Sequence, residues 1–325
     1  MSEEQIEEQE ASQWQKKIEG EWYGCPMVFD GDGSHLGAIK VNRSSAMEGG
    51  KTTYHMDTDI DVSGPLRSRF EAQGFSFGVI DSDQDRVYMG PDFFGAGHPF
   101  GTLVDAHYYS PAWTCDLRTL VHILPDLKTQ VYSSQLFEGP RLIGVFNGLY
   151  KMADDYQSNL ETKKNIDDFV AQEKQDGKNP HILPMKIAGE WTGEFKVFND
   201  KQEEVGQNFI KISYKPIDLL RAHTKTYAEG VWNKKFEVLR SRSSLRHDYM
   251  GPDCFGSSLA YGRALYTSQH FKGEALKIKG REFLIDDNYS MSAVWQVSQS
   301  DKLAYMMYGV LNWKPLEDVL RPTYN

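Results

Sequence analysis

Three polar side chains in the first half of the chain have the types and spacing of a general-base site. Asp105, His107 and Tyr109 stand at positions i, i+2 and i+4, so in a β-strand they share one face. A carboxylate next to an imidazole can orient the ring and raise its basicity, as proton abstraction requires. Asp105 and His107 form the candidate catalytic group together with Asp92 and His98 from the preceding segment. The alternative is a hydrogen-bonded trio without a catalytic role, which we favour because an Asp and His pair is not diagnostic by itself.

A metal site built from the same residues is a further hypothesis. His98, Asp105 and His107 would supply ligands, with His122 added from a neighbouring strand. This spacing matches no known ligand signature. We therefore predict no metal site and no other cofactor.

The loop that repeats most closely contains a Gly-Pro-Asp turn. The pattern Tyr-Met-Gly-Pro-Asp-x-Phe-Gly occurs at Tyr88–Gly95 and again at Tyr249–Gly256. Proline presets φ, the aspartate can accept hydrogen bonds from the following amides, and glycine tolerates a positive φ. A rigid corner between two strands is therefore the first interpretation. The functional alternative places Asp92 and Asp253 at a pocket mouth as acceptors or bases.

Aromatic and methionine side chains are the other group that could form a site. Most of them are expected to fill a core, because aromatic rings bury large areas and methionine fits irregular gaps. We predict that six aromatic residues contact a ligand: Tyr109, Trp113, Tyr132, Phe146, Trp295 and Tyr308. The segment Leu303–Leu311 is apolar on both faces. One of these faces must be covered by packing between barrels, which we favour slightly, or by a ligand inside a barrel.

The strands that must position these residues follow from a period of two. Between Met291 and Ser298 the odd positions are apolar and, apart from Val294, the even positions are polar. Such strands have one buried and one wet face, as in antiparallel sheets. Turn signals such as Asp30–Gly33 and Glu138–Pro140 separate runs of roughly ten residues. Each half is predicted to be an all-β meander of roughly eight to ten strands that closes into a barrel, since closure removes exposed edges.

Two copies of one domain are indicated by three blocks that recur in the same order. Gly-Glu-Trp occurs at Gly20–Trp22 and Gly189–Trp191, the Gly-Pro-Asp loop occurs twice, and Gly144–Asn147 returns as Gly309–Asn312. Small differences in the spacing of the blocks are what changes in loop length produce. Chance does not readily place three such blocks in register.

The predicted domains follow from the positions of the repeats. They are a helical lead-in (residues 1–17), a first β-barrel (18–151), a helical linker (152–184) and a second β-barrel (185–325). The linker helix is predicted from capping-box spacing at Ser158–Glu161 and from an apolar stripe of Ile166, Phe169 and Val170.

The two copies differ in polar residues. Aligning the repeats places Leu259 at the position of His98, Leu265 at that of His107 and Arg263 at that of Asp105. If catalysis takes place, it is therefore expected in the first copy.

The Gly-x-Trp blocks resemble the entry motif of the lipocalin or calycin superfamily. In that superfamily the glycine permits a tight entry into the first strand and the tryptophan plugs the closed end of a barrel. The two copies make the chain similar to tandem lipocalin-like proteins, which include proteins of photosynthetic microbes and, more distantly, a carotenoid-hydratase-like group with related fungal cyclases. The resemblance implies two barrels, one in each half. It does not establish an activity.

Composition excludes some classes of function. The chain has 325 residues with a formal net charge of −10, which argues against a general nucleic-acid binder. It contains no apolar run of the roughly 18 residues that a membrane span needs. The acidic N-terminus and three cysteines without paired spacing predict a cytoplasmic protein.

The leading functional hypothesis is binding of a hydrophobic or conjugated small molecule, such as a lipid, a carotenoid or a tetrapyrrole, in a barrel lumen. The alternative is a cofactor-independent isomerase, cyclase or hydratase that acts on such a ligand. The third hypothesis is a non-enzymatic scaffold in which side chains fill both barrels completely. The ligand and the oligomeric state stay open, with a homodimer among the options.

Overall fold

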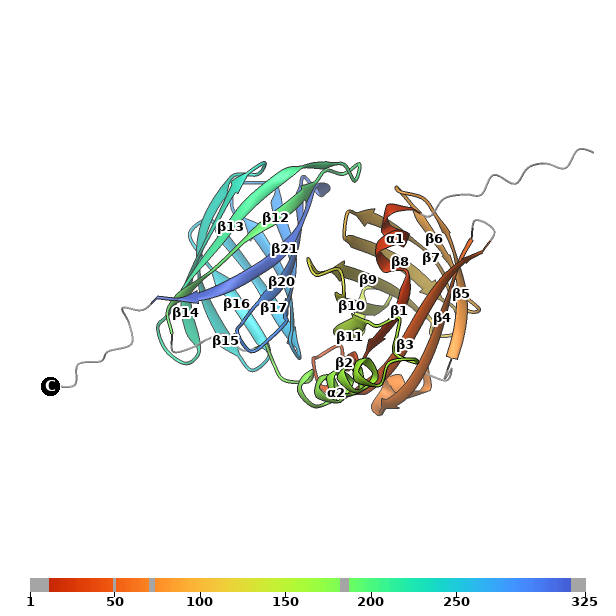
Figure 1. Cartoon of the computed structure of the whole chain (residues 1–325). Helices are drawn as coiled ribbons and strands as arrows, with labels where there is room; N and C mark the ends of the chain where they lie inside the picture. Colours follow the sequence, from red (N-terminus) through yellow and green to blue (C-terminus); the bar gives the residue numbers. More distant parts are fainter. Residues whose placement is uncertain (1–11, 49–50, 70–73, 182–186, 317–325) are drawn as a thin grey trace, which may run out of the picture. The chain divides into compact units, whose positions relative to one another are not determined.

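The computed structural model of the chain describes residues 12–48, 51–69, 74–181 and 187–316. The chain divides into two compact units, residues 1–177 and 178–325. Each unit contains a closed antiparallel β-barrel (Figure 1), and helix α2 (Leu160–Asp176) lies between the barrels along the chain. The prediction of an all-β fold with two tandem barrels and a short helical linker is therefore confirmed.

Barrel 1 is built from the first eleven strands. They are β1 (Gly20–Gly24), β2 (Met27–Asp30), β3 (His35–Glu48), β4 (Lys51–Val62), β5 (Gly74–Asp81), β6 (Arg86–Met89), β7 (Phe94–Phe100), β8 (Leu103–Ser110), β9 (Cys115–Ile123), β10 (Thr129–Glu138) and β11 (Arg141–Met152). A 3-10 helix, η1 (Gly64–Arg69), follows β4.

Closure of barrel 1 depends on β1 and β2, which together fill one strand position. Both pair with β3 on one side and with β11 on the other. The break between them contains Pro26, which has no backbone N–H to donate to a ladder. Barrel 1 is therefore a ten-position barrel in which one position is filled by two short strands.

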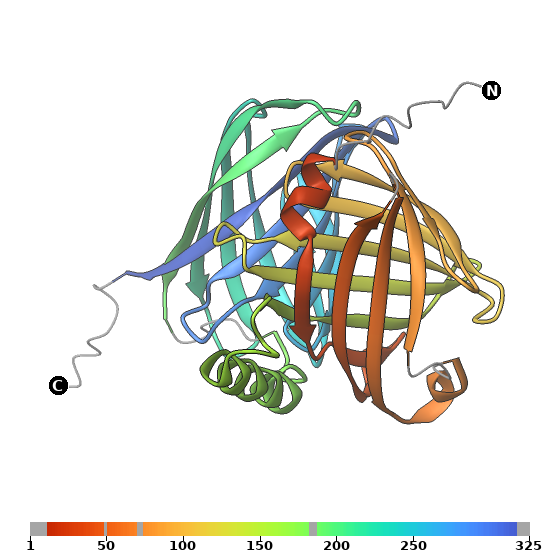
Figure 2. The ribbon, with the colours of Figure 1, turned by 45° about the vertical axis from the view of Figure 1, so that its right-hand side comes forward.

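The short helix α1 (Gln13–Ile18) closes one end of barrel 1. The Ser12 side chain caps the helix by accepting a hydrogen bond from Gln15 N. Trp14 and Ile18 are buried in the core cluster of barrel 1. Figure 2 shows α1 at the end of the barrel where β1 starts. Residues 1–11 of the predicted lead-in lie outside the described part of the chain.

Helix α2 packs against β1 and β11. Of the predicted apolar stripe, Ile166 and Val170 are buried, whereas Phe169 is half-buried with Lys151 Nζ 4.6 Å from its ring centre. The N-cap is Asn159, whose side-chain oxygen accepts hydrogen bonds from Glu161 N and Thr162 N. The predicted Ser158 cap is thus wrong by one residue, because Asn159 takes the N-cap position and its carboxamide oxygen satisfies two of the free amides of the first turn. In the described residues no helix combines the length and apolarity that crossing a membrane demands.

Barrel 2 is a continuous meander of ten strands. They are β12 (Gly189–Phe198), β13 (Glu204–Pro216), β14 (Arg221–Gly230), β15 (Lys234–Ser243), β16 (Arg246–Met250), β17 (Cys254–Tyr261), β18 (Ala264–Phe271), β19 (Leu276–Leu284), β20 (Met291–Gln299) and β21 (Lys302–Pro315). Pairing of β12 with β21 closes the barrel.

The two Gly-x-Trp blocks open the first strand of each barrel. Gly20 has a φ of +106°, and a Cβ there would collide with the Asp154 carboxylate. A Cβ at Gly189 would collide with the ring of Trp313. Trp22 and Trp191 are 0% and 2% exposed and belong to the two core clusters. Each glycine therefore admits a close neighbour beside the point where a tryptophan enters the core.

Candidate functional site

A cavity inside barrel 1 has a volume of about 370 Å³. Inward side chains alternate with outward ones along each strand, as the two-residue period requires. In β8, Val104 and Tyr108 line the cavity, whereas His107 and Tyr109 are exposed. Trp14 and Ile18 of α1 complete the wall at one end. A cavity of this size lies within the usual range for small-molecule sites.

A group of packed aromatic rings forms one wall of the cavity. Tyr54 stacks on Phe77 with ring centres 4.9 Å apart, and Phe77 meets Phe93 edge to face at 5.4 Å. Phe93 meets Tyr108 at 5.7 Å, and Tyr108 meets Tyr88 at 4.9 Å. All five residues line the cavity. The wall therefore offers flat apolar area with few polar atoms.

The cavity tyrosines are proton-bearing groups. Burial raises the pKa of Tyr88 and Tyr132, and it raises the pKa of Tyr108 and Tyr150 well above the ordinary value. Their hydroxyls stay protonated at neutral pH and can donate hydrogen bonds. They are unsuited to act as general bases.

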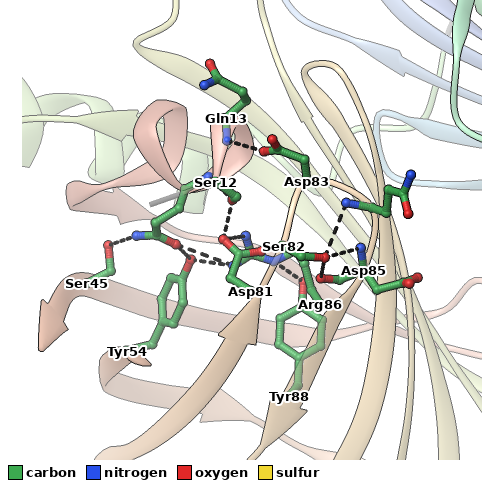
Figure 3. A network of polar contacts seen from close by, with 12 residues as sticks. Ser12, Gln13, Ser45, Tyr54, Asp81, Ser82, Asp83, Asp85, Arg86 and Tyr88 are labelled. Atoms are coloured by element: carbon green, nitrogen blue, oxygen red, sulfur yellow. Dashed lines mark hydrogen bonds and ion pairs between the residues drawn. The ribbon is translucent and has the colours of Figure 1, made fainter. Parts of the chain in front are cut away.

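Arg86 forms a polar network beside α1 (Figure 3). Its Nη1 lies 2.8 Å from Asp81 Oδ2, while Nε donates to the Tyr88 hydroxyl at 3.1 Å and Nη2 to that of Tyr54 at 3.0 Å. The Ser12 hydroxyl also donates to Asp81. Burial raises the pKa of Asp81, and the Arg86 charge opposes this shift. The network joins the cap of α1 to strands β4, β5 and β6 and neutralises the buried guanidinium.

Arg43 is a second buried guanidinium in the cavity wall, and it has different surroundings. Its Nη2 donates to Gln130 Oε1 at 3.2 Å. Its central carbon lies 5.6 Å from the centre of the Trp22 ring and 6.0 Å from that of Tyr150. Burial lowers the pKa of Arg43, although a guanidinium stays charged at any physiological pH.

Asp92 lies in the cavity wall and also joins two loops. Its Oδ2 accepts hydrogen bonds from Ser110 Oγ at 3.1 Å and from Ala112 N at 2.9 Å. These bonds connect the Gly-Pro-Asp loop to the turn that follows β8. The counterpart in barrel 2, Asp253, is exposed and does not line the cavity of that barrel.

The structure places Asp105, His107 and Tyr109 on one face of β8, and this is the outer face. His107 Nε2 lies 3.5 Å from Asp105 Oδ1, and His107 is 57% exposed. His98 Nδ1 lies 3.1 Å from Asp85 Oδ1, also on the outside. None of these histidines lines the cavity. The catalytic roles of His98, Asp105 and His107 stay predictions. The wall of the barrel separates these three side chains from the cavity that Asp92 lines.

A metal centre at this position has no support in the described residues. They contain no group of three or more His, Cys, Asp or Glu side chains placed to hold an ion. His122 is buried, and burial lowers its pKa to about 4.

The strand registers correct the alignment of the repeats in this region. His98 pairs with Asp105, and Leu259 pairs with Tyr266. Asp105 therefore corresponds to Tyr266, and His107 corresponds to Ser268 rather than Leu265. The predicted alignment of Asp105 with Arg263 and of His107 with Leu265 assumed a shorter turn in the second copy. It was wrong because the β7–β8 and β17–β18 hairpins have turns of equal length.

The predicted ligand-contact residues separate into two groups. Trp113, Tyr132 and Phe146 line the cavity of barrel 1, and Trp295 lines that of barrel 2. Tyr109 lies outside the wall of barrel 1 and is 52% exposed. Tyr308 stacks on Phe198 with ring centres 5.7 Å apart and does not line the barrel 2 cavity.

Barrel 2 has a much smaller cavity of about 50 Å³. Trp295 and Ile212 fill part of its interior, and Arg240 and Glu282 lie in its wall. Arg240 Nε donates to His247 Nδ1 at 2.9 Å. Burial lowers the pKa of His247 to about 2, so the ring is neutral and accepts this bond. Such a cavity has room for one or a few water molecules but not for a lipid-sized molecule.

Besides Tyr132, which was predicted, the cavity wall contains residues that were not among the predicted site residues: Arg43, Arg86, Tyr54, Tyr88, Tyr108 and Tyr150. A signal for Arg43 was present, because Ile39, Val41 and Arg43 alternate along one strand and the two apolar residues face the core. A charged residue that continues an inward apolar series is a candidate site residue.

No protein-family model matches the chain, and no curated protein matches it. Among solved structures, the chain is similar to a protein of unknown function from the DUF3598 family of Nostoc punctiforme PCC 73102. The TM-score is 0.59 at 11% sequence identity, with 94% of this chain and 100% of that chain covered. At this identity the similarity shows a shared fold alone. For a putative outer membrane protein from Bacteroides fragilis NCTC 9343, 9% identical over 94% of this chain and 100% of that chain, the TM-score of 0.22 is too low to show a common fold.

Proposed function

We propose that barrel 1 binds one hydrophobic small molecule, such as a lipid, a carotenoid or a tetrapyrrole, and that the chain acts as its carrier. The observation that supports this most directly is the difference between the two interiors. The cavity of barrel 1 measures about 370 Å³, and that of barrel 2 about 50 Å³. Well-packed interiors leave few voids larger than a water molecule, so a cavity of the first size needs an explanation.

The lining of the cavity supports an apolar ligand. Phe75, Phe77 and Phe93 form a continuous aromatic surface, and Val41, Val104 and Val121 face the same space. Buried rings favour a planar or extended apolar molecule by dispersion and by exclusion of water. The Gly-x-Trp entries resemble those of lipocalins, and a place in that superfamily is part of this proposal.

Titration with the neutral probe N-phenyl-1-naphthylamine tests the proposal. Trp14 and Trp113 line the cavity, so tryptophan fluorescence should change saturably with a stoichiometry of about one. Val121→Phe places a ring in the cavity and should weaken binding by about tenfold or more. Asp116→Phe adds the same ring at an exposed position of β9 and should leave binding unchanged. The proposal fails if the response does not saturate or if both variants bind alike.

A second candidate function, a cofactor-independent isomerase, cyclase or hydratase, is favoured by the Asp92 carboxylate in the cavity wall. Asp92→Asn keeps an oxygen that can accept from Ala112 N and should preserve the loop. It should abolish turnover of a conjugated substrate if Asp92 is the base. Loss of turnover in His98→Ala or His107→Ala would place the chemistry on the outer face of β8 instead.

We further propose that the protein works in a reducing compartment such as the cytoplasm. Cys25, Cys115 and Cys254 are buried, unpaired thiols. Burial raises the pKa of each to about 11, so they are protonated and poorly reactive. Fractionation of the native cell, with detection of the protein by antibody, tests this location.

A further inference from the structure

We infer that the ligand of barrel 1 carries a carboxylate, and that this group pairs with Arg43 inside the cavity. The inference rests on the proposed binding function and deepens it, because it names the polar end of an otherwise apolar molecule. The ligand class is then a hydrophobic monocarboxylic acid.

Arg43 is a buried cation for which the described residues provide no counter-charge. It is 8% exposed, and no carboxylate of the described residues forms an ion pair with it. Its surroundings are the neutral Gln130 amide and the rings of Trp22 and Tyr150. Within the described residues Arg43 Nε and Gln130 Nε2 are buried without hydrogen-bond partners. A buried charge is tolerated when it is paired, so a missing partner points to an anion from outside the chain.

Arg86 is a second buried arginine of the same barrel, and its charge is paired with a carboxylate of the chain. It also lines the cavity, but its guanidinium is compensated by Asp81 and by the hydroxyls of Tyr54 and Tyr88. Within the described part of the chain, one buried arginine therefore has a carboxylate partner and the other has none. The difference selects Arg43, and not Arg86, as the position for an acidic ligand.

Barrel 2 shows that this fold does not require a cation at the Arg43 position. Trp22 pairs with Arg43 across β1 and β3, and the equivalent pair across β12 and β13 is Trp191 with Ile212. Ile212 packs against the core of barrel 2. An apolar residue thus satisfies the same environment beside the entry tryptophan, in the barrel whose cavity is too small for such a ligand.

The positions of the charges also give the ligand a direction. Gln130, the partner of Arg43, pairs with Ile123 at the end of β9 next to the start of β8. Asp92 is bonded to Ser110, the last residue of β8. The anion-attracting and anion-repelling groups therefore lie toward opposite ends of the cavity. The acid should enter first, with the apolar body along the aromatic wall.

Fluorescence titration of the full chain with cis-parinaric acid and with its methyl ester tests the inference. In the natural sequence the acid should bind about tenfold or more tightly than the ester. Arg43→Met should remove this preference by weakening the acid alone, and Arg43→Lys should keep most of it because the charge remains. The comparison of acid and ester in the natural sequence needs no variant. It therefore tests the inference even if a variant does not fold.

The results separate this inference from the proposed function. Equal affinities for acid and ester in the natural sequence, or equal weakening of both by Arg43→Met, would overturn the inference while leaving apolar binding in place. If acid, ester and N-phenyl-1-naphthylamine all fail to bind, the proposed function and the inference fall together.

Discussion

Trp22 and Arg43 lie directly opposite each other on β1 and β3, with the guanidinium carbon 5.6 Å from the centre of the indole ring. The tryptophan is part of a motif that occurs twice in the chain, whereas the arginine occurs at this place in only one of the two barrels. Trp22 is therefore a residue that both barrels use for the fold, whereas the position of Arg43 can be occupied by an apolar residue, as it is in barrel 2.

We expect Arg43→Met to stabilise the ligand-free protein by about 1 kcal/mol or more. The substitution removes an uncompensated buried charge, and the loss of a cation–π contact offsets part of the gain. Urea unfolding of delipidated protein measures the effect. A loss of stability of similar size would show that Arg43 is a structural residue, and Arg43→Ile, which copies barrel 2, serves as the matched control.

We expect the opposite result at Arg86. Arg86→Met leaves Asp81 buried without its ion-pair partner and should lower the free energy of unfolding by about 3–5 kcal/mol. The double variant Asp81→Asn with Arg86→Met should recover part of this loss, because neither charge remains. Thermal and urea unfolding of the natural sequence and of the two variants test this expectation. A cost below about 1 kcal/mol for Arg86→Met would contradict the structural role of this network.

The entry glycine of barrel 1 should tolerate substitution less well than a turn glycine. Gly20→Ala combines a positive φ with a collision against Asp154 and should cost about 3 kcal/mol. Gly139→Ala also has a positive φ, of +55°, but no atom lies within 4 Å of the added methyl, and it should cost about 1 kcal/mol. Equal costs in unfolding experiments would show that the contact with Asp154 does not matter.

Stability should fall as the pH drops below the ordinary histidine pKa. Burial lowers the pKa of His181 to about 3 and that of His247 to about 2, from 6.5. Between these values the unfolded chain binds protons that the folded chain does not, so the free energy of unfolding decreases as pH falls. From pH 7.5 to pH 5 we expect a loss of roughly 1–2 kcal/mol per histidine.

A pair of variants isolates this effect. His181→Phe should reduce the loss of stability between pH 7.5 and pH 5, because one of the protonating groups is gone. His223→Gln, at an exposed position of β14, should leave the pH dependence unchanged. Identical pH profiles for the natural sequence and His181→Phe would mean that His181 titrates in the same way when folded and unfolded.

Local patterns predicted the elements of this fold well. The alternation along β20 and the recurrence of Gly-x-Trp predicted antiparallel barrels and their number, because strand faces and entry turns depend on neighbours in sequence. The same alternation correctly placed Asp105 and His107 on one face of β8. It could not say that this face points outward, because both faces of the segment carry residues of mixed polarity.

The sequence by itself determined two copies of a closed all-β domain, since period-two patterning and repeated blocks are written along the chain. Only the tertiary structure decided that one barrel is hollow and the other nearly filled, and that Arg86 has a carboxylate partner while Arg43 has none among the described residues. The physical reason is that cavity volume and charge compensation are sums over side chains from many strands. The contacts of Asp81 with Arg86 and of Trp22 with Arg43 form only when strand pairing brings these residues together.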